Sequence, residues 1–285
     1  VNNTPKQILI YEALGQKPPA FAHLPLINAP DRTKLSKRRH GEVVSVTTYR
    51  DKGFIPEAFR NFLALIGWSA GTDQEFFNTE ELIAAFSLDG ISRGNAIVNF
   101  SETDPRQWTD RKALHLNAEH MNRMPIDALL PFVEAELKGA GLWDESWAEG
   151  WNRRDWFRKA VDILRPRFVT LKDFSGLGRA FFDSTFDIDP VAVAKNVDKG
   201  PGVRAWLVGL AGRFKGLAEF NKETAEVELR KLADELGIKA GLLINGSRTV
   251  TTGVSVGPPL FDLLECLGQD LVVERLSGAS AFGRS

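Results

Sequence analysis

The 285-residue sequence has little cysteine, no excess of charge of either sign and no long apolar run. Its single cysteine, Cys266, excludes an internal disulfide and leaves no cysteine cluster for zinc or an iron-sulfur centre. No apolar segment reaches the roughly 18 residues of a membrane helix, and the N-terminal region lacks the pattern of a secretion signal. We therefore expect a cytoplasmic protein that does not bind a membrane.

The charges are balanced, with 36 Lys and Arg against 37 Asp and Glu, which argues against indiscriminate coating of nucleic acid. Hydrophobic residues make up 43% of the chain, enough to offset the entropy cost of folding. Two local clusters of basic residues stand out. Five of the eight residues 32–39 are basic, and residues 153–172 contain seven more, interleaved with aromatic residues. These clusters are either solvated helix faces or contacts to nucleic acid.

Helical periodicity predominates, so we predict a mostly α fold. Amphipathic helices are expected over residues 56–67, 154–164, 224–236 and 259–268. Pro56 is suited to a first helical position, and Gly237 to a left-handed helix end. Short strands are expected over residues 41–46, which are rich in β-branched residues, and over residues 242–250.

The most informative motif is Lys34-Leu35-Ser36-Lys37-Arg38, within a basic stretch. Two ammonium groups three residues apart on a loop can bind a polyphosphate while negative charge moves to a departing pyrophosphate. No Walker glycine pattern accompanies the motif, so a P-loop nucleotide-binding protein is not expected. Taken alone, such a motif is more often a solvated basic loop.

Several further motifs occur in a fixed order along the chain. They are NNTPKQILIYEALG, PPAFAHLPLI, KLSKRRHG, VVSVTTYRDKG and FIPEAFRNFLALIGWS, then WFRKAVDILRPRFVTLKDF and VGPPLFDLLECLGQDLVVERL. Together they resemble the bacterial glutamyl-tRNA synthetase family of class I aminoacyl-tRNA synthetases, over essentially the whole chain. The family's HIGH-type sequence and inserted acceptor-binding domain are absent from this sequence. We therefore expect a C-terminal portion that lacks the N-terminal catalytic half.

The resemblance implies the end of a class I Rossmann catalytic domain over residues 1–30 and a signature loop with a stem-contact region over 31–128. An α-helical anticodon-binding domain would follow, with one part at 129–195 and another at 196–285. The intact parent would activate glutamate with ATP and Mg²⁺ and transfer it to tRNA(Glu). This portion is expected to bind tRNA as a monomer, without a cofactor and without catalysis. The alternative is a non-catalytic RNA-binding module of synthetase ancestry.

By resemblance, Lys34, Ser36 and Lys37 belong to the loop that closes on ATP. Lys37 is then the catalytic residue that contacts the transition-state phosphates. A tRNA backbone contact, or plain solvation, is the alternative for either lysine. No metal site is expected, since Asp183, Asp187 and their neighbours lack the glycine and glutamate of a calcium loop.

The segment Arg165-Pro166-Arg167-Phe168 is similar to a family segment whose second arginine reads the third anticodon base. Arg167 is therefore expected to read that base and to favour tRNA(Glu) over tRNA(Gln), with a helix C-terminal cap as its alternative role. The other anticodon contacts implied by the resemblance are Arg248, Gly257, Pro258 and Leu260. The turn 257–260 departs from the family's P-G-L-F pattern, and its alternative role is to start a helix.

Four tryptophans, at spacings of four, four and five, are either a platform for stacking bases or a packing stripe between helices, and packing is the expected role. They are Trp143, Trp147, Trp151 and Trp156. Cys266 is expected to be a small buried hydrophobic residue on the last apolar helix.

Overall fold

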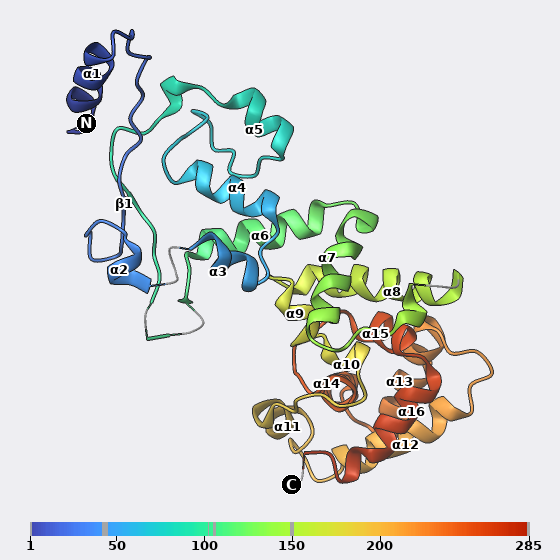
Figure 1. The fold of residues 1–285 in the computed structure, drawn as a ribbon. Helices are drawn as coiled ribbons and strands as arrows, with labels where there is room; N and C mark the ends of the chain where they lie inside the picture. Colours follow the sequence, from blue (N-terminus) through green and yellow to red (C-terminus); the bar gives the residue numbers. More distant parts are fainter. Residues whose placement is uncertain (1, 42–44, 102, 105–106, 149–150, 284–285) are drawn as a thin grey trace. The chain divides into compact units, whose positions relative to one another are not determined.

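The computed structural model describes residues 2–41, 45–101, 103–104, 107–148 and 151–283 (Figure 1). By its internal contacts the chain divides into two compact units, Val1–His120 and Met121–Ser285. Helices predominate in both, as the sequence predicts. The described residues contain two short strands, β1 (Ile27–Asn28) and β2 (Ala96–Ile97). The prediction of a mostly α fold is confirmed.

The first unit combines short helices with this parallel strand pair, in which Ile27 lies opposite Ala96 and Asn28 opposite Ile97. The predicted helix over 56–67 is confirmed as α4 and begins at Pro56. The helices of this unit are α1 (Thr4–Ala13), α2 (Lys37–His40), α3 (Val46–Asp51), α4 (Pro56–Leu65), α5 (Thr79–Ala85), the 3-10 turn η2 (Leu88–Gly90) and most of α6 (Arg111–Arg123).

The core of the first unit is aromatic and is built from α3, α4 and α6. Tyr49, Phe54, Phe62 and Leu116 are buried in one cluster. The Tyr49 hydroxyl lies 2.7 Å from the Thr109 hydroxyl, so the only polar atom of that buried ring is hydrogen-bonded. This core fixes α4 and α6 beside the strand pair.

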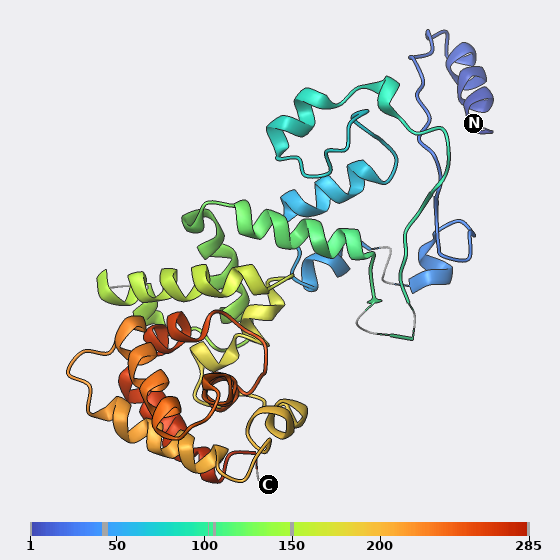
Figure 2. The ribbon, with the colours of Figure 1, turned by 180° about the vertical axis from the view of Figure 1, so that it is seen from behind.

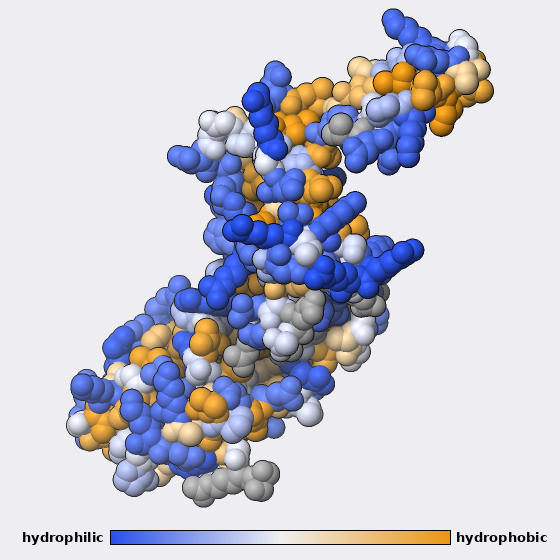
Figure 3. All heavy atoms as spheres, turned by 90° about the vertical axis from the view of Figure 1, so that its left-hand side faces the viewer, coloured by the Kyte–Doolittle hydropathy of each residue, from blue (hydrophilic) through white to orange (hydrophobic). Residues whose placement is uncertain are grey.

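Hydrophobic side chains are exposed near the N-terminus. Helix α1 has no buried residue, and Leu9, Ile10 and Leu14 are each more than half exposed. Figure 3 shows hydrophobic residues in orange on the surface at the top of the view, where α1 and the segment after it lie. Among the described helices, none combines the length and the apolar character that crossing a membrane requires.

The second unit is helical throughout its described residues. Helices α12 and α16 pack along each other, as Figures 1 and 2 both show. The helices are α7 (Ile126–Gly139), α8 (Trp151–Leu164), α9 (Lys172–Ser175), α10 (Arg179–Phe182), α11 (Pro190–Asn196), α12 (Val203–Lys215), α13 (Lys222–Glu235), α14 (Ala240–Thr252), α15 (Leu260–Leu267) and α16 (Gln269–Ser277), with 3-10 turns η4 (Glu145–Trp147), η5 (Arg165–Arg167) and η6 (Gly278–Ser280).

Three more predicted helices are confirmed as α8, α13 and α15. The strand predicted over 242–250 is wrong, because this segment forms α14. Leu243, Ser247 and Val250 follow helical spacing and are fully buried, so packing of one helix face overrides the β-propensity of the segment. Of the strand predicted over 41–46, residues 42–44 lie outside the described residues, and Val46 begins α3 instead.

The tryptophans pack together rather than forming an open platform. Trp147 is buried, and its ring lies 5.4 Å from the rings of Trp143 and Trp156, centre to centre. The Trp156 indole donates a hydrogen bond of 2.8 Å to the carbonyl oxygen of Cys266, whose side chain is only 4% exposed. The predicted packing roles of these tryptophans and of Cys266 are confirmed, whereas the side chain of Trp151 lies outside the description.

Candidate functional site

The basic loop, defined here as residues 29–41, leaves β1 through a tight turn. The Ala29 amide donates to the Thr33 carbonyl at 2.9 Å, and the Arg32 amide to the Ala29 carbonyl at 2.8 Å. Arg32 lies in the left-handed region with φ of 64°. An antiparallel bridge then pairs Lys34 with Asn28. Lys34 is therefore held on a short hairpin at the end of β1.

A second set of interactions joins the two halves of the basic loop at Asp31. Its carboxylate accepts hydrogen bonds from the Thr33 hydroxyl at 2.6 Å and the Thr33 amide at 3.0 Å, and pairs with Arg39 at 2.9 Å. The bonds from Thr33 and the positive charge of Arg39 lower the pKa of Asp31. Asp31 is therefore ionised at neutral pH and links the hairpin to α2.

The three residues predicted to bind ATP lie together in this loop. Ser36 is the residue before α2, and Lys37 is the first residue of that helix. Lys34 and Lys37 are exposed, and neither forms an ion pair with any residue that the structure describes. Two unpaired ammonium groups on one short loop can approach the oxygens of a polyphosphate.

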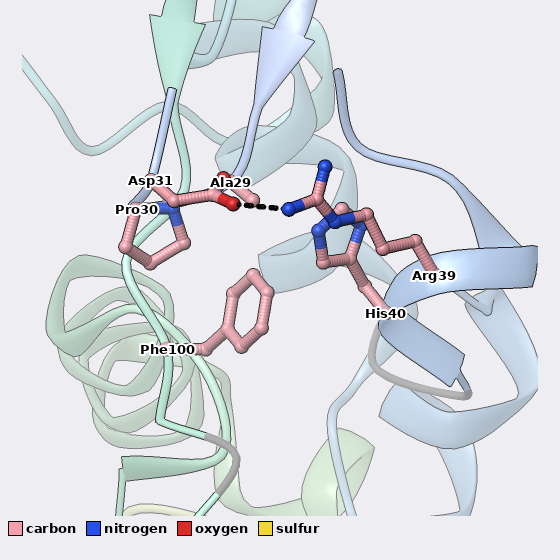
Figure 4. Close-up of a pocket in the computed structure, with 6 residues that line it drawn as sticks. All are labelled: Ala29, Pro30, Asp31, Arg39, His40 and Phe100. Carbon is pink, nitrogen blue, oxygen red and sulfur yellow. Dashed lines mark hydrogen bonds and ion pairs between the residues drawn. The ribbon is translucent and has the colours of Figure 1, made fainter. Parts of the chain in front are cut away.

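An open pocket of about 480 Å³ lies against the basic loop (Figure 4). The Asp31–Arg39 ion pair lines one side of this pocket. The ring of Phe100, which belongs to the segment after β2, points towards that ion pair. His40 contacts Phe100 edge to face, with ring centres 5.9 Å apart. Sequence reasoning missed this pocket, because Phe100 reaches the loop only through the pairing of β1 with β2.

In the second unit, the motif Arg165-Pro166-Arg167-Phe168 ends α8 and forms η5. Arg165 donates a hydrogen bond of 2.8 Å to the Met124 carbonyl and pairs with Asp162 at 2.8 Å. Phe168 is 3% exposed and packs in the core. Arg167 is exposed, and it makes no ion pair and no hydrogen bond to a helix carbonyl within the described part of the chain. The motif therefore anchors its flanking residues and presents Arg167 to solvent.

Arg248, on α14, is half-buried near Arg167. Its guanidinium donates a hydrogen bond to the Pro258 carbonyl oxygen. Burial lowers the pKa of Arg248, and the positive charge of Arg167 lowers it further. The fold thus brings together two predicted anticodon-contact arginines from different helices, and the charge of Arg167 disfavours that of Arg248. Such a pair favours a negatively charged or strongly hydrogen-bonding ligand.

The remaining predicted contacts lie in the turn before α15, beside Arg248. A Cβ added to Gly257 would lie 3.4 Å from the Arg248 guanidinium, so the turn approaches Arg248 closely. Pro258 and Leu260 are buried, with Leu260 only 3% exposed. These two residues face the core with their side chains, which leaves the backbone of the turn as the part that can meet a ligand.

The second basic cluster of the sequence is largely neutralised in the fold. Within the part of the chain that the structure describes, six of its seven basic residues form ion pairs, and Arg167 does not. The pairs are Arg153–Asp144, Arg154–Glu134, Arg158–Asp127, Lys159–Glu265, Arg165–Asp162 and Lys172–Glu136. Most of this cluster is therefore a solvated, paired surface, and the charge available to an anionic ligand is concentrated at Arg167.

No group of three or more metal-ligating side chains occurs among the residues that the structure describes. Asp183 pairs with Arg179 at 2.8 Å, and Asp189 accepts a hydrogen bond from the Val191 amide at the start of α11. These aspartates have structural partners.

Two known protein families match different parts of the chain, and these parts correspond roughly to the two compact units. Residues 126–280 match an anticodon binding domain family, and residues 1–105 match the catalytic domain of tRNA synthetases class I (E and Q). The chain is 46% identical over 279 residues to the glutamate-tRNA ligase of Desulfotalea psychrophila, covering 98% of this chain and 56% of that protein. It is 43% identical over 280 residues to glutamate-tRNA ligase 2 of Koribacter versatilis, covering 98% of this chain and 55% of that protein.

Solved structures show the same likeness. A glutamate tRNA ligase from Elizabethkingia meningosepticum, solved in complex with its amino acid, superposes with a TM-score of 0.75 at 26% identity. The match covers 99% of this chain and 56% of that one. The chain thus spans about half the length of the curated relatives it matches.

Proposed function

Because this chain belongs to the glutamate-tRNA ligase family, we propose that it recognises tRNA(Glu) and carries the loop that contacts the phosphates of ATP. The longer ligase activates glutamate with ATP and transfers it to tRNA. Residues 1–30 are the end of its catalytic domain, and 31–128 are the signature loop and stem-contact region. Residues 129–195 and 196–285 are the two parts of the anticodon-binding region.

The observation that carries this proposal is the exposed guanidinium of Arg167, which lies beside Arg248 and has no ion-pair partner among the described residues. Single-stranded RNA bases are recognised by stacking and by hydrogen bonds to their edges, and a planar guanidinium does both. The neighbouring basic residues already have carboxylate partners. Arg167 can therefore bind RNA without first breaking an ion pair, which gives it the lowest free-energy cost of binding. Arg167 reads the third anticodon base and favours tRNA(Glu) over tRNA(Gln).

The other proposed anticodon contacts are Arg248 and the turn beside it. Arg248 holds the turn at Pro258 and contributes positive charge. Gly257 and Pro258 offer backbone groups beside the base, and buried Leu260 fixes the start of α15 beneath the turn. Rigid backbone groups next to a splayed base add specificity at little entropic cost.

The basic loop serves the other substrate. Lys34, Ser36 and Lys37 fit a polyphosphate, because both lysines are exposed and lack ion pairs with described residues. ATP, bound with Mg²⁺, supplies the phosphoanhydride whose cleavage drives activation of glutamate. Lys37 contacts the phosphates as charge moves onto the pyrophosphate. Since the sequence lacks a HIGH-type motif, the chain alone binds tRNA without catalysis.

Binding of fluorescent transcripts tests the anticodon role. We expect the chain to prefer tRNA(Glu) over tRNA(Gln) in fluorescence anisotropy, and Arg167→Gln to weaken tRNA(Glu) binding about tenfold, as loss of one base contact predicts. The control variant is Arg230→Gln, which removes an exposed arginine of α13 that pairs with Glu226. It should leave the preference unchanged.

Salt dependence separates recognition from simple attraction. A steep salt slope with equal affinity for both transcripts would show only phosphate contacts. Equal binding that does not respond to Arg167→Gln would contradict the role of Arg167. A loss in Arg230→Gln equal to that in Arg167→Gln would have the same consequence, since it would reflect net charge alone.

A further inference from the structure

His40 makes two hydrogen bonds to Ser36, one through its ring and one through its backbone amide. The Ser36 amide donates to Nδ1 of the His40 ring at 3.2 Å. The His40 amide in turn donates to the Ser36 carbonyl oxygen at 3.0 Å. Both the backbone amide and the backbone carbonyl of Ser36 are thus hydrogen-bonded to His40. Residues 37–39 lie between them and form a closed single turn.

At the start of α2 the His40 ring makes a capping hydrogen bond, although the side chain of the N-cap residue usually does so. Ser36 has the extended conformation typical of an N-cap residue, with φ of −151° and ψ of 146°. Its own side chain makes no capping hydrogen bond. Helix α2 has only four residues, too few to be stable by backbone hydrogen bonds alone. The His40 ring is therefore the side chain that closes this turn.

The ring itself is held from outside the turn. It packs edge to face on Phe100, with an angle of 77° between the ring planes (Figure 4). Phe100 follows β2, whose pairing with β1 brings it to the basic loop. The neighbouring Arg39 pairs with Asp31 on the hairpin side. The orientation of the ring is thus set by two segments far apart in the sequence.

We propose that His40 is a positioning residue, which fixes the direction of Lys37 through the hydrogen-bonded turn from Ser36 to His40. This inference rests on the proposed phosphate-binding function of the basic loop. Lys37 follows Ser36 directly, so the backbone of Ser36 sets where the Lys37 side chain leaves the loop. Lys34 is held separately by its bridge to Asn28. The spacing between the two ammonium groups therefore depends on His40.

Two substitutions of His40 distinguish the effect of the hydrogen-bond acceptor Nδ1 from the effect of side-chain size. In His40→Asn the amide oxygen lies near the position of Nδ1 and can still accept from the Ser36 amide. In His40→Gln the side-chain amide extends to the position of Nε2, and the acceptor near Ser36 is lost. His115→Asn is the matched control, because His115 is an exposed histidine of α6 that contacts Glu119.

The first measurement is hydrogen exchange of the Ser36 amide, followed by NMR in the 285-residue chain. One hydrogen bond contributes about 1 kcal/mol, so we expect exchange about fivefold faster in His40→Gln. His40→Asn and His115→Asn should exchange at the rate of the unaltered chain. Equal acceleration in His40→Asn and His40→Gln would overturn the proposal. Unchanged amide signals elsewhere show that each variant is folded.

The second measurement is a titration of the same chains with inorganic tripolyphosphate, followed at the Lys34 and Lys37 amides. Affinity should fall about fivefold in His40→Gln and remain unchanged in His40→Asn. Faster exchange in His40→Gln without any loss of affinity would overturn the positioning role. Signals of the unaltered chain that do not respond to tripolyphosphate would instead contradict the proposed phosphate-binding function, while the Ser36 exchange rates still decide whether His40 closes the turn.

Discussion

At the scale of single residues, Arg165 and Arg167 show how much surroundings matter. They are two positions apart, but of the two only Arg165 has a backbone carbonyl and a carboxylate as partners among the described residues. We expect Arg165→Gln to lower the free energy of unfolding by about 1–2 kcal/mol, because it removes a charge-assisted hydrogen bond from a side chain that is only 18% exposed. Arg167→Gln should change it by less than about 0.5 kcal/mol.

Urea unfolding followed by circular dichroism checks this contrast. The denaturant midpoint should fall in Arg165→Gln and stay in place in Arg167→Gln, with similar slopes for both. A matching loss of stability in the two variants would mean that Arg167 also has a structural partner. Its effect on tRNA binding would then no longer be a test of base recognition.

Cys266 is a second residue whose chemistry is set by burial. Burial raises the pKa of its thiol from 9.0 to about 12. The thiol is therefore neutral at pH 8, and Ellman's reagent should react with it more than about a hundredfold more slowly in the native chain than in urea. Equal rates in both states would contradict its buried position.

The same pKa shift predicts how stability depends on pH at this residue. The pKa of the Cys266 thiol is higher in the folded chain than in the unfolded chain. The unfolded chain therefore loses the thiol proton at a lower pH than the folded chain does. The stabilising contribution of the neutral thiol is complete below about pH 9 and declines as the pH rises towards 12. Comparison with Cys266→Ala across this range isolates the contribution.

At the scale of elements, α13 could be predicted from its sequence, whereas α14 could not, although it too ends at a left-handed glycine, Gly253. Helix α13 begins with a capping box at Asn221 and is followed by Gly237 with φ of 62°. In α14 the run from Thr249 to Thr252 indicates a strand. The hydroxyls of Thr251 and Thr252 instead bond back to helix carbonyls, at 2.7 and 2.8 Å. Such local bonding cannot be read from β-propensity.

The candidate site divides in the same way. The motifs that contain Lys34, Lys37 and Arg167 could be singled out as candidate sites, because they are local in the sequence, but their roles remain predictions. The ion pairs that neutralise the second basic cluster could not be predicted, since partners such as Glu134 and Glu265 lie on α7 and α15. Nor could the proximity of Arg167 to Arg248, which depends on how η5 and α14 pack.

At the scale of the whole molecule, each compact unit contains its own candidate site. The basic loop and its pocket are built only from residues of the first unit. The arginine pair and the turn at Pro258 are built only from residues of the second. The formal net charge is −1, so attraction of an anionic ligand depends on local concentrations of positive charge rather than on the average.

This division predicts that the second unit folds and recognises RNA without the first. Helix α6 ends at Arg123, so a chain that begins at Met124 keeps α7 to α16 intact, and it also keeps the Met124 carbonyl that Arg165 binds. Its core contains fully buried side chains from α7, α8, α12 and α14, among them Leu129, Phe157, Leu207 and Leu243. A core of this kind supports a single cooperative unfolding transition.

We expect the chain from Met124 to Ser285 to show helical circular dichroism and one thermal transition. Its binding to tRNA(Glu) should still weaken about tenfold in Arg167→Gln, because Arg167, Arg248 and the turn at Pro258 all remain. Its overall affinity should be lower and less dependent on salt than that of the 285-residue chain, since most of the proposed stem-contact region is absent. A broad transition without cooperativity would show that the two units fold only together. Intact folding with no response to Arg167→Gln would mean that the first unit is needed to bring the anticodon to Arg167.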